Sequence, residues 1–135
     1  MATTGNFISG YDSAGLLIEN GDGTTLQDLI APSGADIHIH AIVATTDDSS
    51  AVNLQLWNND GTTDTLLTTK TVPAGAGMSD GVPAESLLDE AHLPTLDSSP
   101  GRFITLGDGE KLKIAPLATV TSAKTVWVTV YYGTF

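Results

Sequence analysis

Cysteine is absent from this 135-residue chain and cationic residues are scarce, with five Lys and Arg against 16 Asp and Glu, for a formal net charge of −11. Without cysteine there can be no disulfide framework, thiolate zinc site or cysteine nucleophile. A surface this acidic is repelled by nucleic-acid phosphates and anionic lipid headgroups. We therefore expect neither nucleic acid nor a membrane as a partner. The lack of thiols also fits assembly in a reducing cytoplasm.

Long apolar runs are missing as well. The longest uninterrupted apolar stretches are only a few residues, so no segment is expected to span a membrane. Residues 1–15 contain neither the basic region nor the apolar core of a secretory signal, and we expect the chain to stay in the compartment where it is made. Hydrophobic residues still make up 41% of the sequence, which is enough for the packed core of one domain.

Apolar residues recur with a period of two along most of the chain, a pattern that predicts β-strands. In segment 35–46, the expected inward residues are Ile37, Ile39, Ala41 and Val43, and the expected outward residues are His38, His40 and Ile42. In segment 124–132, one face carries Val126, Val128, Val130 and Tyr132, and the other carries Thr125, Trp127, Thr129 and Tyr131. Branched and aromatic side chains of this kind fit a pleated, half-buried surface.

A β-hairpin is predicted over residues 51–72, because residues 58–61 (Asn-Asn-Asp-Gly) tolerate the left-handed backbone of a tight turn. Segment 25–31 fits either one helical turn or a short strand. The other expected strands are 15–20, 102–106 and 110–117. Seven strands can bury their apolar faces only in two stacked sheets or a barrel, and an antiparallel β-sandwich is the simplest solution.

Two segments depart from the strand pattern. Residues 1–14 are expected to form an extended N-terminal arm, which leaves residues 15–135 as a single β-sandwich domain. The long connection 73–101 is expected to contain one short helix, with Ser86 as its N-cap and Pro94 as its stop. Connections of this length in compact domains are usually functional or contact a partner.

The pair His38 and His40 is the feature that suggests a metal, because residues i and i+2 of a strand share a face. A cupin-like site would need a carboxylate shortly afterwards, and residues 41–46 contain none. Solvent-facing strand residues are the commoner explanation. The segment 60–64 could offer oxygen ligands to Ca²⁺, but it lacks the spacing of an EF-hand loop. We therefore expect no metal and no other cofactor.

Catalytic signatures are not present. The sequence contains no Gly-x-Ser-x-Gly motif, no P-loop and no dinucleotide-binding fingerprint. The densest carboxylates are Glu85, Asp89 and Glu90, which we interpret as the solvated face of the expected short helix. The sequence therefore predicts a protein that is not an enzyme.

Surface for partners is the stronger signal. Trp57, Trp127 and Tyr131 are expected on outward strand faces, where they could form a glycan platform or a protein interface. The alternative is that segment 25–31 or the long connection folds over them. Candidate anchor contacts in the arm are Phe7, Ile8 and Tyr11, and secondary candidates in the long connection are Pro83, Leu87, Leu88 and Leu93.

The order of motifs resembles small proteins encoded beside the major coat proteins of tailed bacteriophages. The likeness covers residues 28–135 and includes TVPAGAG at 71–77, GVPAESLLDEAHLPTLD at 81–97 and FITLGDGEKLKIAP at 103–116. Segment 106–112 is also similar to a hairpin found late in jelly-roll sequences. Those phage proteins are thought to be capsid decoration (cement) proteins of jelly-roll type. The resemblance thus implies an all-β, jelly-roll-like sandwich.

The resemblance also implies a function. A decoration protein binds the exterior of the expanded capsid between major capsid protein subunits, and it stabilises the shell by binding the mature lattice preferentially. We expect such a protein to be made in the host cytoplasm and to act as a homo-oligomer, a trimer rather than a dimer. Two alternatives stay open. One is a receptor- or glycan-binding module of a phage tail or fibre, and the other is a small cupin-like metalloprotein centred on His38 and His40.

Overall fold

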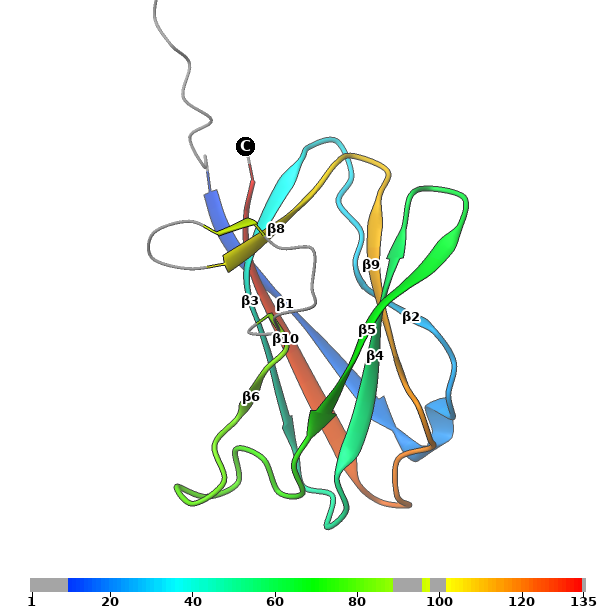
Figure 1. The fold of residues 1–135 in the computed structure, drawn as a ribbon, viewed down its shortest axis with the longest axis vertical. Helices are drawn as coiled ribbons and strands as arrows, with labels where there is room; N and C mark the ends of the chain where they lie inside the picture. Colours follow the sequence, from blue (N-terminus) through cyan, green and yellow to red (C-terminus); the bar gives the residue numbers. More distant parts are fainter. Residues whose placement is uncertain (1–9, 89–95, 98–101, 135) are drawn as a thin grey trace, which may run out of the picture.

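The computed structural model describes residues 10–88, 96–97 and 102–134, and they form two antiparallel sheets packed face to face. Sheet A contains β1 (Gly10–Glu19), β10 (Thr125–Thr134), β3 (Ile37–Thr46), β8 (Arg102–Leu106) and β7 (Leu96–Asp97) in that order, with β6 (Glu85–Ser86) also paired to β3. Sheet B contains β2 (Gln27–Ile30), β9 (Lys111–Pro116), β4 (Val52–Asn59) and β5 (Asp64–Val72). Figure 1 shows sheet A on the left and sheet B on the right.

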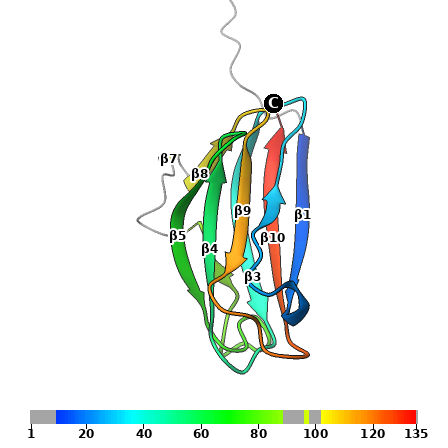
Figure 2. The same cartoon turned by 90° about the vertical axis from the view of Figure 1, so that its right-hand side faces the viewer.

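The strand order identifies the fold as a jelly roll. If the two-residue strands β6 and β7 are set aside, successive strands alternate between the sheets except for the hairpin β4–β5, which lies wholly in sheet B. As a result, β1 and β10 are neighbours in sheet A, while β2 and β9 are neighbours in sheet B. Figure 2 looks onto sheet B, with β5, β4, β9 and β2 side by side. This nested order is that of two Greek keys wound into a double sheet. The prediction of an all-β, jelly-roll-like sandwich is therefore confirmed.

The core lies between the sheets and consists almost wholly of aliphatic side chains. The largest fully buried ones are Ile18, Ile39, Ile42, Leu54, Leu56, Leu87, Leu106, Leu112, Ile114, Val72, Val120 and Val126. They come from both layers, as stacked sheets with alternating inward residues require. None of the described residues belongs to a helix long and apolar enough to cross a membrane.

Strand β3 changes its inward set halfway along, which the alternation in the sequence did not predict. Tyr131 pairs with Ala41, but the next residue, Tyr132, pairs with Ile39, so His40 is an extra residue on β3. Such a bulge shifts every later side chain to the opposite face. Ile37 and Ile39 are buried as expected, whereas Ala41 and Val43 point outward and Ile42 is fully buried. The prediction was wrong for these last three residues.

Other boundaries also differ from expectation. The first strand begins at Gly10 rather than at residue 15, because all ten residues of β1 pair with β10. The predicted arm therefore loses residues 10–14, and residues 1–9 lie outside the described part. The turn at 107–109 does not close a hairpin, since β8 belongs to sheet A and β9 to sheet B. Segment 25–31 forms the short strand β2, and the hairpin at 51–72 is confirmed as β4 and β5.

The helix expected in the long connection is not seen where it could be checked. Ser86, its expected N-cap, pairs with Val43 as part of the short strand β6. Residues 89–95, which would form the body of that helix, lie outside the described residues. Nearby, Glu85 forms an ion pair with Lys70 of β5 at 3.5 Å, which links the two sheets at this edge.

One end of the sandwich is tied together by the carboxylate of Asp48, which is 2% exposed. Its oxygens accept hydrogen bonds from Ser50 N at 2.9 Å, Thr121 N at 3.1 Å and Thr121 Oγ1 at 2.9 Å. Its carbonyl accepts a fourth from Gly75 N at 2.9 Å. A single residue after β3 thus joins the connections that follow β5 and β9.

Burial alone would raise the pKa of Asp48, but the hydrogen bonds from Ser50 and Thr121 and the positive charge of Lys124 together lower it below its ordinary value. The carboxylate is therefore ionised in the folded protein at neutral pH. A buried charge of this kind is tolerated because three hydrogen-bond donors are directed at it.

The bulge predicts that, of the adjacent residues Ile42 and Val43, Ile42 contributes more to the stability of the fold. Ile42→Ala should lower the free energy of unfolding by about 2–5 kcal/mol, because it leaves a cavity in the core. Val43→Ala, on the outer face, should cost about 1 kcal/mol or less. Denaturant unfolding at neutral pH measures both. The opposite ranking would show that β3 continues without a bulge.

Because the Asp48 carboxylate is buried and hydrogen-bonded, we expect the protein to lose folding stability in acid. Asp48→Ala should cost about 2–4 kcal/mol at neutral pH, because the donors around it lose their acceptor. Since its folded pKa is lowered, the carboxylate stabilises the fold above the ordinary Asp pKa of about 3.9, and this stabilisation is lost as the pH falls toward the folded value. Asp48→Asn should therefore show a shallower fall in unfolding free energy on acidification. Equal slopes for Asp48→Asn and the unsubstituted protein would contradict this role.

Candidate functional site

The outer face of sheet A is the most unusual surface among the described residues. The strand register places side chains of β1, β10 and β3 in rows across this face. One row is Leu17, Trp127 and Thr45, a second is Ser13, Tyr131 and Ala41, and a third is Tyr11, Gly133 and His38. We call this surface the aromatic face, defined by Tyr11, Leu17, His38, His40, Trp127 and Tyr131.

The aromatic face exposes large apolar side chains that a folded domain would ordinarily shield. Tyr11 is 77% exposed, Leu17 53%, Tyr131 49% and Trp127 36%. Contiguous exposed aromatics of this kind mark interaction sites more often than ordinary surface. Tyr11, which was expected in an N-terminal arm, belongs to β1 and lies at one end of this face, because it pairs with Gly133 of β10.

Charge is nearly missing from the aromatic face. Among the described outward residues of β1, β10 and β3, Glu19 is the one carboxylate, and it lies at the end of β1 away from Tyr11. The remaining outward residues are Ser, Thr, Gly, Ala, Val, His, Leu and aromatic residues. In a chain of net charge −11, acidic groups other than Glu19 are thus absent from the described outer face of β1, β10 and β3. Depletion of charge with enrichment of aromatic residues is the compositional signature of a protein-interface core.

The bulge at His40 creates the upper part of this face. The ring of His40 lies 5.7 Å from that of Tyr11, centroid to centroid, and 6.3 Å from that of His38 in an edge-on arrangement. Between Tyr11 and His38 stands Gly133, which has no side chain and is buried. Rings on the flanking strands thus cover a glycine in the central strand, an arrangement that shields its backbone from water.

The two histidines do not form a metal centre with other described residues. No group of three His, Asp or Glu side chains suited to a metal ion occurs in the described ranges, and His92 lies outside them. Burial, and secondly the charge of His40, lower the pKa of His38 below its ordinary value. The imidazole of His38 is therefore neutral at neutral pH.

The outer face of sheet B is different in character. Lys113 lies 3.3 Å from Asp64 and 3.9 Å from Asp28, and Lys111 lies 3.4 Å from Asp28. Trp57 lies on this charged face, paired across the strands with Leu66 and Lys113, and its indole nitrogen is buried. Trp57 is thus outward as predicted, but it lies on the opposite side of the molecule from Trp127 and Tyr131. The three cannot form one platform.

The remaining predicted contact residues separate into three groups. Pro83 is exposed, as a contact residue must be. Leu87 and Leu88 are 0% and 4% exposed and belong to the core, so the prediction that they contact a partner was wrong. Their apolar character reflects packing against β3, where Leu87 N donates to Ile42 O at 2.8 Å. Phe7, Ile8 and Leu93 lie outside the described residues.

The carboxylates of segment 60–64, which could offer ligands to Ca²⁺, have partners within the protein. Asp60 accepts hydrogen bonds from the backbone N–H groups of Thr62 and Thr63, which lower its pKa. Asp64 accepts a hydrogen bond from Asn59 Nδ2 at 2.7 Å and also faces Lys113. These contacts shape the β4–β5 turn, as Asp commonly does in turns.

A scan against protein-family models finds no match for the chain, and a search of curated proteins finds none either. Sequence reasoning found Trp127 and Tyr131 from simple alternation. It named Tyr11 as a contact in an N-terminal arm and His40 as an outward residue, but it did not place either beside Trp127 and Tyr131, because that depends on where β1 starts and on the bulge.

The histidine pair predicts a measurable titration. We expect the His38 imidazole to titrate below its ordinary pKa of about 6.5. Because its folded pKa is lowered, protonating it costs stability as the pH falls from that value. His40→Asn should raise the pKa of His38 without restoring it fully, since burial, the larger cause, persists. Two-dimensional NMR of the imidazoles measures this, and an unchanged value would rule out coupling between the two rings.

Proposed function

We propose that this protein is a non-enzymatic structural virion protein that binds the outer surface of an expanded phage capsid through its aromatic face. The observation that carries the proposal is the uncharged, aromatic surface on one sheet of a strongly acidic chain. The sequence resemblance to decoration proteins supplies the class of partner, the major capsid protein. The jelly-roll fold is compatible with that class, although many unrelated functions use the same fold.

The charge distribution supports different roles for the aromatic face and for the other surfaces of the protein. An interface core gains most from aromatic contacts that exclude water, and Glu19 lies at its margin. Acidic residues on the other surfaces keep the protein soluble. Because packaged DNA would repel them, these surfaces face away from it. Binding to the mature lattice, and not to the immature one, stabilises the shell by mass action.

Several copies acting together would strengthen such binding. A homo-oligomer that contacts several coat subunits gains effective concentration, so modest individual contacts suffice to hold the shell. We propose a trimer in preference to a dimer, as part of the same function. Sedimentation equilibrium of the purified protein measures the oligomeric state directly.

A glycan-binding module of a phage tail or fibre is the second candidate. It is favoured by Trp127 and Tyr131, which lie on the same face of one strand with Thr129 between them. Aromatic rings spaced along a strand can stack against sugars. Glycan-array binding by the isolated protein would support this candidate, whereas a decoration protein should show none.

The aromatic face and the face of sheet B offer a matched pair for testing. Tyr131 is 49% exposed and Leu66 is 48% exposed, on opposite sheets. Tyr131→Glu should weaken co-sedimentation with undecorated, expanded capsids by about tenfold or more, because it places a carboxylate in the interface core. Leu66→Glu should leave binding unchanged.

Both variants should unfold at similar denaturant concentrations, which separates binding from folding. Loss of binding in Leu66→Glu alone would move the interface to sheet B. Failure of the unsubstituted protein to bind any capsid form would overturn the decoration function.

A further inference from the structure

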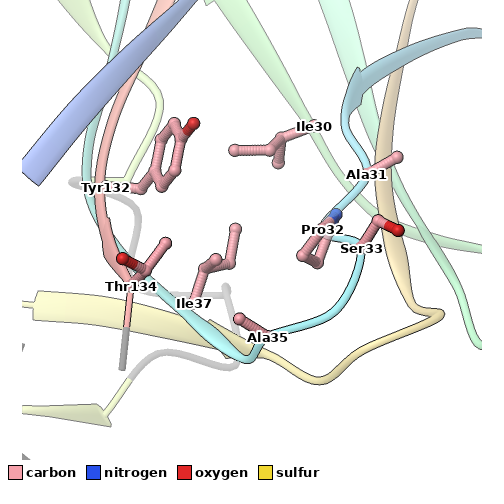
Figure 3. A pocket seen from close by; sticks show the side chains of 8 residues that line it. All are labelled: Ile30, Ala31, Pro32, Ser33, Ala35, Ile37, Tyr132 and Thr134. Atoms are coloured by element: carbon pink, nitrogen blue, oxygen red, sulfur yellow. The ribbon is translucent and has the colours of Figure 1, made fainter. Parts of the chain in front are cut away.

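A pocket of about 190 Å³ opens at the end of the sandwich where β1 begins and β10 ends. Figure 3 shows the side chains around it, with Tyr132 and Thr134 from β10 and Ile37 from β3. Ile30 comes from the end of β2, and Pro32 comes from the connection between β2 and β3. No charged side chain lines it. This pocket lies between the sheets and is distinct from the aromatic face.

The rim of the pocket is held in place by hydrogen bonds. Gly34 N donates to Asp108 Oδ1 at 2.9 Å, and Asp108 N donates to Asp36 Oδ1 at 3.0 Å. These bonds fasten the connection after β2 to the turn between β8 and β9. On the other side, Tyr132 OH lies 3.5 Å from Asp12 Oδ2 of β1. The pocket is therefore largely pre-formed, as binding sites for small apolar groups usually are.

Its size and lining fit one apolar side chain. An apolar cavity of about 150 Å³ is large enough to hold benzene. A pocket of about 190 Å³ without charged groups can thus accept a phenyl ring or a branched aliphatic side chain. Left open to water, it would expose apolar surface between the sheets.

We propose that this pocket binds one apolar side chain of the chain's own N-terminal segment, residues 1–9, supplied by the pair Phe7–Ile8. Gly10 pairs with Thr134, which lines the pocket, and a side chain at Gly10 would lie 3.6 Å from Thr134 Oγ1. The chain before Gly10 therefore starts beside the pocket. Phe7 is three residues away, a reach of about 10 Å.

The composition of the segment matches the pocket. Residues 1–9 contain no charged side chain, and Phe7 and Ile8 are adjacent bulky apolar residues within it. A tether of so few residues gives an effective concentration of about millimolar or higher, so the chain's own segment fills the pocket ahead of a second copy. This inference does not rest on the proposed capsid function, because the pocket and the aromatic face share no residue.

The first test compares two double variants. Phe7→Ala with Ile8→Ala should lower the equilibrium constant for folding by about tenfold or more, through loss of buried apolar area. Thr3→Ala with Thr4→Ala, in the same segment, should leave it unchanged. Denaturant unfolding of the full chain measures both. Equal stability of the two double variants would overturn the proposal.

The second test uses the absence of cysteine, which makes any introduced pair unambiguous. Phe7→Cys with Ala35→Cys should form an intramolecular disulfide on mild oxidation, because Ala35 lines the pocket. Phe7→Cys with Ser50→Cys, at the opposite end of the sandwich, should not. Mass spectrometry and non-reducing gels distinguish the products. A disulfide-linked dimer would assign the pocket to a second copy, and no cross-link at all would show that the segment does not occupy it.

Discussion

The bulge at His40 is the constraint on which both surfaces of sheet A depend. Strand β3 is ten residues long and must keep aliphatic side chains toward sheet B along its whole length. In each half of β3, aliphatic residues that face the core alternate with residues that face outward. Between the two halves, however, this pattern is shifted by one residue. Inserting His40 between the pairs Tyr132–Ile39 and Tyr131–Ala41 restores the phase. Without it, Ile42 and Ala44 would face water, and Val43 would be forced into the core.

The same insertion gives the outer face its aromatic character. Because the extra residue points outward, its imidazole reaches the ring of Tyr11 across the glycine in the central strand. The acidic residues, meanwhile, are concentrated in turns, where Asp48, Asp60 and Asp108 accept backbone hydrogen bonds. The net charge of −11 is thus compatible with an aromatic face that carries no carboxylate, because carboxylates such as these act where the chain reverses.

The features that the sequence predicts correctly are those that depend on neighbouring residues alone. Strand β10 follows simple alternation, and its inward Val126, Val128 and Val130 were predicted correctly. The bulge has no local signature, since a histidine within a strand is equally compatible with regular pairing. The separation of Trp57 from Trp127 depends on which sheet each strand joins, a long-range property. Their place in a long connection predicts that Leu87 and Leu88 are surface residues, but the connection packs against β3 and both side chains are buried.

The two ends of the sandwich show opposite solutions to the same problem. Loops at an open end must satisfy their backbone groups and also cover the core. At one end Asp48 does both: its buried carboxylate holds the connections after β3 and β9, and its main-chain carbonyl accepts a hydrogen bond from the connection after β5. At the other end, Asp108 fastens the rim but leaves an uncharged pocket beneath it. The polar end accounts for the expected sensitivity to acid, whereas the apolar end leaves the pocket that, in our proposal, a side chain from residues 1–9 fills.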